Sequence, residues 1–562
     1  MKSMRHSSVF LVGLMSLAQG FFGSADLLAR ESLSAVGLTS EFTIVETTAN
    51  HLLFEEVIGD SIEPKMQWFS DAKLGIFIHW GIYAVDGTSE SWSFHNRSTP
   101  YPQYMSQLQR FGAEKYDPKA WAALIKESGA QYAVITTKHH DGVAMYPTQR
   151  LTPPSPWSSN AQEPLAYPKG KKKPSEIFLW NPKHPLSVMD QSPILLNAPA
   201  RKDVMTPLVN ALRAEGLKFG AYYSLLDWSH GDYPGFFKDQ GRYKIADDTF
   251  RWRIFTKFMH DQIDELSRLY KPDLFWFDGD WEHSNAEWNA AKIRKDILSV
   301  NPNAILNGRL QGFGDYATPE QNMPIHRPML MGADGKPHRA PWELCLTSND
   351  NWGWRPNDTM MKTSNEVIRI FAECLGMGGN LLLDIGPKAD GTITPEQTQL
   401  LKDLGKWNRK HAEAIFGTVA GLPVGHFYGP STLSKDSQVL YLFLTQVQGV
   451  PRDDKFIEEE ALEEAINEVL GKAGDDPIEL DGGPGVSYSL MVKGLKNEIE
   501  SAEILGLEGT LQPKVVGKIS WSSVPGTVFM NVPIDALDEQ VTVVKLKLKG
   551  PLRLYEGQGG FH

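Results

Sequence analysis

The sequence has 562 residues, which exceeds one domain of ordinary size and predicts a large domain together with a smaller one. Its formal net charge of −12 argues against a nucleic-acid-binding surface. Two cysteines, Cys345 and Cys374, are too few for a disulfide framework or a cysteine-based metal site.

The N-terminus has a basic start, an apolar stretch over 9–17 and small residues up to Ala25. This order is typical of a secretory signal peptide, so we expect residues 1–25 to be one and the protein to be secreted or periplasmic. An N-terminal core helix is the alternative. The apolar stretch is too short to span a bilayer, and no later segment is long enough for a transmembrane helix. Residues 26–62 are expected to form an N-terminal extension.

Between residues 63 and 416, short apolar runs alternate with amphipathic stretches. Strands are predicted at 74–80, 131–136, 218–224, 273–277, 304–307, 343–346 and 380–385, and helices at 118–128, 204–215, 250–270, 286–298 and 395–410. This alternation predicts an α/β fold in which parallel strands and helical crossovers form a (β/α)8-type barrel. An open doubly wound sheet is the alternative. It would need a glycine-rich phosphate turn after the first strand, where His79-Trp80-Gly81 stands.

Residues 417–562 have a different sequence pattern: short strand-like runs follow one another with turns between them and without helical segments. Strands are predicted at 439–444, 487–492, 514–521, 527–532 and 541–548. This pattern predicts a C-terminal antiparallel β-sandwich domain. A Glu-rich stretch near 456–472 is expected to be an inserted acidic helix. A long Pro- and Ser-rich stretch, 147–198, interrupts the barrel and is expected to cover a site or to be mobile.

The segment 272–282, with the sequence PDLFWFDGDWE, carries the strongest functional signal. Its apolar run ends on Asp278, which Trp276 and Trp281 flank. Barrel enzymes place catalytic groups at the C-terminal ends of their strands, and tryptophan faces pack on sugar rings. The alternative is that Asp278 only caps the next helix.

Polar side chains accompany the other predicted strands, and a barrel would bring them to one mouth. They are His79, His139, His140, Tyr223, Arg309 and Glu343. Donors around two carboxylates suit a polyhydroxylated ligand, because each desolvated hydroxyl needs a partner. Two carboxylates are also what glycoside hydrolysis requires, one at the anomeric carbon and one to protonate the leaving oxygen.

Two other functions compete with this interpretation. The first is a metal-dependent barrel hydrolase, since His79, His139, His140 and Asp278 are ligand types. The first strand has a single histidine, however, and adjacent His139 and His140 point opposite ways on a strand, so we expect no metal and no other cofactor. The second is a carbohydrate-binding protein without catalysis. A pure binder has little need to bury two carboxylates.

Six ordered blocks, at 73–81, 136–142, 216–224, 276–279, 341–343 and 378–387, resemble the α-L-fucosidases of glycoside hydrolase family 29. They are KLGIFIHWG, TTKHHDG, GLKFGAYYS, WFDG, PWE and GGNLLLDIGP. The resemblance implies a (β/α) barrel followed by a β-sandwich. It also implies exo-acting removal of terminal α-L-fucose, with retention, from a fucosylated oligosaccharide or polysaccharide.

By this resemblance, Asp278 is the nucleophile and Glu343 the general acid/base. For Glu343, a structural carboxylate that pairs with Arg309 or the backbone is the alternative. The resemblance implies sugar binding by His79, Glu90, Trp92, His139, His140, Tyr223, Trp276 and Arg309. Asp384 stands where the family usually has Asn and is expected not to touch the chemistry. The stretch 147–198 is expected to shape the aglycone side of the pocket; the natural glycan and the oligomeric state stay open.

Overall fold

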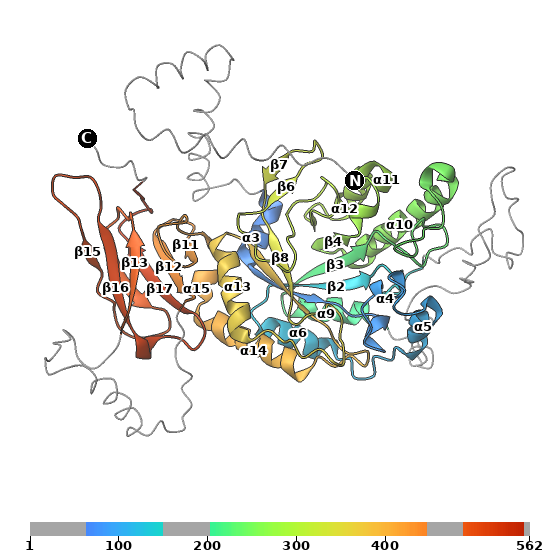
Figure 1. Ribbon diagram of the computed structural model, residues 1–562, viewed down its shortest axis with the longest axis horizontal. Helices are drawn as coiled ribbons and strands as arrows, with labels where there is room; N and C mark the ends of the chain where they lie inside the picture. Colours follow the sequence, from blue (N-terminus) through green and yellow to red (C-terminus); the bar gives the residue numbers. More distant parts are fainter. Residues whose placement is uncertain (1–62, 150–202, 447–486, 556–562) are drawn as a thin grey trace, which may run out of the picture. The chain divides into compact units, whose positions relative to one another are not determined.

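The computed structural model describes residues 63–149, 203–446 and 487–555 (Figure 1). The expected signal peptide, the N-terminal extension, nearly all of the 147–198 stretch and the acidic helix at 456–472 lie outside these residues.

Seven parallel strands form one curled sheet, and each overlaps a strand that the sequence predicts (Figure 1). Their order in the sheet is β5-β4-β3-β2-β1-β9-β8. The strands are β1 (Leu74–Ile78), β2 (Tyr132–Lys138), β3 (Lys218–Ser224), β4 (Leu274–Asp278), β5 (Ile305–Leu306), β8 (Glu343–Thr347) and β9 (Asn380–Ile385).

Helices follow the strands along the chain and cover the outside of the curled sheet (Figure 1). The principal ones are α6 (Pro118–Glu127), α9 (Met205–Ala214), α10 (Thr249–Tyr270), α12 (Ala290–Val300), α13 (Ser364–Gly376) and α14 (Pro395–Lys410). Shorter ones are α3 (Gln67–Ala72), α4 (Trp92–His95), α5 (Tyr101–Ser106), α11 (Asn285–Trp288) and α15 (Ala412–Ile415). Helix α14 begins as the sequence predicts: Pro395 occupies its first turn, and the Thr394 side chain accepts a hydrogen bond from the Gln397 amide.

Buried side chains form two clusters, one on each face of the sheet, because successive strand residues point to opposite faces. The outer cluster joins strand residues such as Ile76 and Phe275 to the helices. The inner cluster fills the concave side, and three residues of the region around α3 complete it: Met66, Phe69 and Ala72. Its strand residues include Phe77, Tyr132, Val134, Tyr222, Leu274, Trp276, Ile305, Cys345 and Leu382.

The segment around Tyr316 lies between the two edge strands of the sheet. Isolated parallel bridges join Asn307 to Tyr316, Ala317 to Trp342 and Glu320 to Cys345. The Tyr316 ring is also part of the inner cluster. The sequence analysis predicted no strand here. Between this segment and β8, a short antiparallel hairpin forms from β6 (Met329–Met331) and β7 (Pro337–Arg339).

The C-terminal strands are antiparallel, as predicted, and form two sheets. The five-stranded sheet has the order β10-β11-β12-β17-β14, with β10 (Val419–Ala420), β11 (Ser431–Leu433), β12 (Val439–Leu444), β17 (Thr542–Leu548) and β14 (Ile499–Ile504). The three-stranded sheet has the order β13-β16-β15, with β13 (Ser487–Lys493), β16 (Thr527–Pro533) and β15 (Lys514–Val516).

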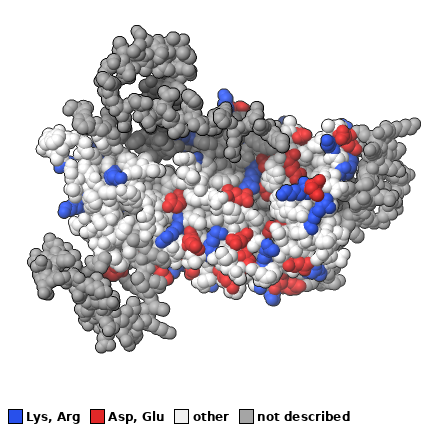
Figure 2. Space-filling view, in the orientation of Figure 1, with Lys and Arg blue, Asp and Glu red and all other residues white. Residues whose placement is uncertain are grey.

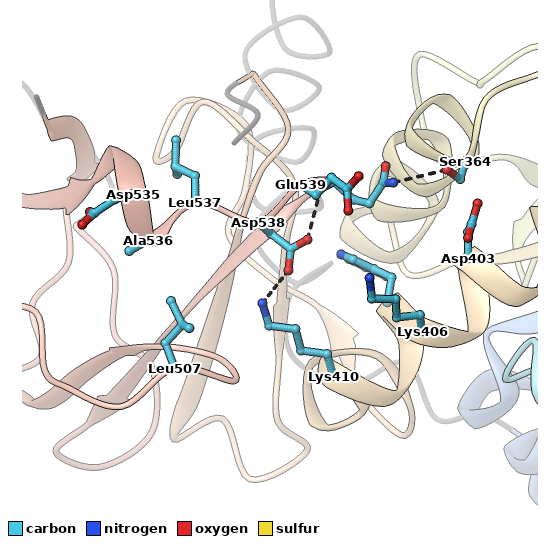
Figure 3. Close-up of a pocket in the computed structure, with 12 residues that line it drawn as sticks. Ser364, Asp403, Lys406, Lys410, Leu507, Asp535, Ala536, Leu537, Asp538 and Glu539 are labelled. Atoms are coloured by element: carbon cyan, nitrogen blue, oxygen red, sulfur yellow. Dashed lines mark hydrogen bonds and ion pairs between the residues drawn. The ribbon is translucent and has the colours of Figure 1, made fainter. Parts of the chain in front are cut away.

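Helix α14 meets the loop before β17 at a junction that encloses a cavity of 470 Å³ (Figure 3). The Trp407 indole donates to the Val541 carbonyl at 2.8 Å, and the Lys410 ammonium lies 2.5 Å from the Asp538 carboxylate. None of the residues that line this cavity belongs to the predicted site.

The described surface carries charges of both signs. On the face drawn in Figure 2, lysines and arginines are interspersed with aspartates and glutamates. None of the described helices is both long enough and apolar enough to cross a membrane.

Candidate active site

Asp278 is the last residue of β4, a strand that is buried along its whole length. The chain then turns at Gly279, whose φ of 81° is unfavourable for any residue with a side chain. A Cβ atom at this position would lie 2.3 Å from Leu226. The strand and the tight turn together fix the Asp278 carboxylate, which stays 8 % exposed.

Two donors bind the Asp278 carboxylate, and the His140 ring lies beside it. The Arg309 guanidinium donates to Oδ1 at 2.9 Å, and the Tyr222 hydroxyl donates to Oδ2 at 2.8 Å. The His140 Nε2 atom lies 3.6 Å from Oδ2. Hydrogen bonds of this kind stabilise the ionised form of a carboxylate and fix its direction.

The three predicted histidines lie side by side next to this carboxylate. Ring centroids are 6.0 Å apart for His79 and His139 and 4.3 Å apart for His139 and His140. Each Nδ1 atom has a protein partner: His79 meets Asp384 at 2.6 Å, His139 meets Ser91 at 2.5 Å, and His140 meets Ser224 at 2.6 Å. Burial lowers the pKa of all three imidazoles well below the ordinary value, so the rings are neutral.

Asp384 does touch the site, contrary to expectation. Its carboxyl is fully buried and bonded to His79, a predicted sugar-binding residue. Burial raises the pKa of Asp384 well above the ordinary value, and the charge of Glu90 adds to this effect. Burial therefore opposes the charged form of both groups in the Asp384–His79 pair.

Aromatic rings line the same region. The Trp276 ring stacks on Tyr222 with centroids 5.7 Å apart, and the Arg309 guanidinium lies 4.5 Å above Trp276. Trp92 meets His140 edge-on at 5.5 Å. Glu90 is buried and accepts a hydrogen bond from the Gly353 amide at 2.7 Å, beside Trp352, which packs on His79.

The structure corrects the expected position of one tyrosine. Tyr223 points to the outer face of β3, where its hydroxyl donates to Gln262 of α10 at 2.8 Å. Tyr222, which points inward, is the tyrosine that contacts Asp278. Adjacent strand residues face opposite sides of a sheet. An error of one residue in the prediction therefore placed Tyr223, instead of Tyr222, on the inner face.

The structure also corrects the expected position of Glu343. It is the first residue of β8, at the opposite end of the parallel sheet from Asp278, and it is 0 % exposed. Its carboxyl accepts from the Trp276 indole at 3.0 Å and from the Tyr132 hydroxyl. Burial raises the pKa of Glu343 to about 7. Trp276 thus lies between Glu343 and the region of Asp278, and the structure does not bring the two carboxyls together.

Glu320, which the sequence analysis did not name, is an acidic residue that is linked to Asp278 through Arg309. The Arg309 guanidinium that binds Asp278 also donates to Glu320 at 2.5 Å, and the Glu320 side chain is 41 % exposed. This residue lies in the bridged segment beside β8. An arginine shared by two carboxyl groups holds both side chains in fixed positions on the same guanidinium.

Among the described residues, no group of three or more His, Cys, Asp and Glu side chains has the geometry to hold a metal ion. The imidazole Nδ1 atoms are engaged by Asp384 and two serines, which leaves Nε2 as the atom that can meet a ligand.

A carboxylate pair bridged by arginine, with neutral histidines and aromatic faces around it on a parallel α/β sheet, defines a glycoside hydrolase. The chain belongs to the alpha-L-fucosidase family, whose model matches residues 54–167 and 180–413.

Named relatives agree with this family. The tissue alpha-L-fucosidase of Bos taurus is 29 % identical over 383 residues, which cover 63 % of this chain and 69 % of the relative. The alpha-L-fucosidase of Branchiostoma floridae is also 29 % identical, over 64 % of this chain and 74 % of its own length.

Solved alpha-L-fucosidase structures have a fold similar to that of this chain. Alpha-L-fucosidase isoenzyme 1 from Paenibacillus thiaminolyticus has a TM-score of 0.63 and 28 % identity, covering 86 % of this chain and 99 % of its own. An alpha-L-fucosidase from Bacteroides thetaiotaomicron, solved as a trapped covalent intermediate, has a TM-score of 0.63 at 23 % identity, over 88 % of this chain and 98 % of its own. This second likeness is one of fold.

Proposed function

We propose that the protein is an exo-acting, retaining α-L-fucosidase that releases terminal α-L-fucose from fucosylated glycans by double displacement. The observation that carries this proposal is the Asp278 carboxylate, which is held by Arg309 and Tyr222 at the end of β4. Family membership supplies the identity of the sugar. Retention then follows from two successive displacements at the same carbon.

Asp278 acts as the nucleophile. Its carboxylate attacks C1 of the fucosyl group, the glycosidic bond breaks, and a covalent fucosyl-enzyme forms. Arg309 and Tyr222 hold the carboxylate in one orientation before the attack.

Glu320 acts as the general acid and base. It gives a proton to the leaving oxygen in the first step and takes one from water in the second. Its exposure and its shared contact with Arg309 support this role. Glu343, by contrast, has no route to a leaving group from the interior of the sheet.

The histidines bind the sugar hydroxyls. Because each Nδ1 atom is occupied, the Nε2 atoms of His79, His139 and His140 are the ones that contact fucose. Neutral rings suit a neutral ligand, since a charged ring in the site would be costly to desolvate. The buried Trp276 ring supports the site from below, because it packs against Tyr222 and the Arg309 guanidinium, the two groups that bind Asp278.

The test is hydrolysis of an aryl α-L-fucoside by wild type, Asp278→Asn and Asp278→Gly. Loss of the nucleophile is expected to lower kcat by a factor on the order of 10⁴. Azide should restore turnover of Asp278→Gly and give the fucosyl azide of inverted configuration. Asp280→Asn, two residues further on, is the matched control. Full activity in Asp278→Asn would refute the proposal.

We also infer that the curled sheet closes into an eight-stranded barrel and that the C-terminal sheets pack as a sandwich. The bridges through Tyr316, Ala317 and Glu320 supply the eighth strand position between β5 and β8. A single inner cluster draws side chains from every strand and from Tyr316. In β16, buried and exposed residues alternate, as the inner face of a sandwich requires.

A further inference from the structure

Trp281 follows Asp278 by three residues, and the mechanism above gives it no role. It lies in a single helical turn, Asp280–Glu282, and its side chain is 52 % exposed. Other tryptophans of this region, such as Trp228 and Trp288, are fully buried. A large apolar ring that stays exposed to solvent beside the proposed nucleophile suggests contact with a ligand.

Three rings lead from Asp278 outward to solvent. His140 has its Nε2 atom 3.6 Å from the carboxylate and is 1 % exposed. Trp92, which is half-buried, meets His140 edge-on. The Trp281 ring runs parallel to Trp92, with 13° between the planes and 6.4 Å between the centroids, and meets His140 edge-on at 5.9 Å. Trp281 is therefore the outermost ring of a connected set.

The turn that carries Trp281 is anchored on both sides. The Asp280 carbonyl accepts a hydrogen bond from the Trp288 indole at 3.0 Å. The Glu282 carboxylate accepts from the Trp228 indole at 3.1 Å and from the Tyr233 hydroxyl. A ring on a fixed backbone loses little conformational freedom when it binds a ligand.

We propose that Trp281 forms the subsite for the sugar to which fucose is attached, and that its indole packs on the apolar face of that pyranose. The proposal rests on the proposed function, because fucose must lie deep to reach Asp278 and the next sugar then lies outward, toward the rim. Aromatic faces pack on the C–H face of a pyranose with little demand on the identity of the sugar. The subsite therefore favours fucose linked to a pyranose over small leaving groups.

The test compares two substrates of Trp281→Ala. α-L-Fucosyl fluoride has no ring in its leaving group, whereas a fucosylated lactose presents a pyranose to the subsite. We expect kcat/KM for the fucosylated lactose to fall about three- to tenfold, mainly through KM, and kcat/KM for the fluoride to change less than about twofold. Trp281→Phe, which keeps a flat ring, should recover part of the loss.

Trp521→Ala is the matched control, because Trp521 is 84 % exposed but lies in the C-terminal region. It should leave both substrates unaffected. An equal loss on both substrates, or no loss on the fucosylated lactose, would overturn the subsite. Wild type that cleaves neither substrate would instead refute the proposed function, so the two failures are distinguishable. A thermal melt of each variant separates binding from misfolding.

Discussion

Charged and polar side chains meet both at the carboxyl end of the curled sheet around Asp278, here called the mouth, and at the junction of α14 with the C-terminal sheets. At the mouth, His79 and Asp384 form a pair whose side chains are 5 % and 0 % exposed. At the junction, Lys545 and Glu413 form a pair whose side chains are 24 % and 49 % exposed. Burying ionisable groups is costly, whereas exposed ion pairs cost little and contribute little. The His79–Asp384 pair therefore carries a desolvation cost that the Lys545–Glu413 pair does not.

The two places also differ in whether their polar groups are left free to bind a ligand. The junction encloses 470 Å³, lined by lysines and acidic residues (Figure 3). Its polar groups already engage one another, as in the Lys410–Asp538 pair. At the mouth, the imidazoles keep one nitrogen each for a ligand. Polar groups that converge on one point, and not the volume of a cavity, therefore distinguish the candidate active site from the junction.

After the loss of Asp278, the largest effect is expected at Glu320. Glu320→Gln should lower kcat by about 10²- to 10⁴-fold on a glycan, whose leaving oxygen needs a proton, and much less on an activated aryl fucoside. With Glu320→Gly, azide should give a fucosyl azide of retained configuration, opposite to the product of Asp278→Gly. Glu539→Gln, at the junction cavity, is the control. Equal losses on both leaving groups would remove Glu320 as the proton donor.

Glu343 should affect stability instead of leaving-group chemistry. The folded pKa is raised to about 7, so the folded protein takes up a proton before the unfolded chain does as the pH falls. As the pH falls from about 7 to about 4.5, the protonation of this group should therefore raise the free energy of unfolding by on the order of 3 kcal/mol. Glu343→Gln should remove that part of the pH dependence, as measured by thermal melts. Glu413→Gln should keep it, and an unchanged slope in Glu343→Gln would contradict the assignment.

The misplacement of Glu343 has a clear physical cause. Barrel sites form at the C-terminal ends of strands, but Glu343 precedes the apolar run 344–346 and begins its strand. Asp278 does end its strand, as the sequence predicts. A polar residue can therefore be placed at the carboxyl end of the sheet only when the sequence shows that it follows the apolar run of its strand and does not precede it.

Tyr222 and Glu320 were missed for other reasons. Strand β3 is buried on both faces, so its sequence has no alternation to tell Tyr222 from Tyr223. Glu320 lies in a segment with isolated bridges only, where Pro319 has no amide hydrogen to donate and no apolar run marks a strand. The predicted strands were found because each is a compact apolar run. The signal peptide and the acidic helix at 456–472 stay predictions.

A smaller effect is expected at Asp384. If its carboxyl is neutral, it donates to His79 Nδ1, and an amide at the same position can do the same. Asp384→Asn should therefore keep kcat/KM for α-L-fucosyl fluoride within about twofold, whereas Asp384→Leu should lose about tenfold, the equivalent of one hydrogen bond. A drop at alkaline pH that wild type shows and Asp384→Asn lacks would mark ionisation of the carboxyl. Similar losses in both variants would mean that an ionised carboxylate is required.

The smallest effect is expected at the junction. The Lys410 and Asp538 side chains are 32 % and 13 % exposed, so water screens much of their attraction. Lys410→Met should lower the free energy of unfolding by about 0.5 kcal/mol in urea titrations, and added salt should shrink the difference. Asp403→Asn, on the same helix and cavity, is the control. A loss comparable to that from a buried pair would show that water does not reach the junction, and the contrast with the mouth would then fail.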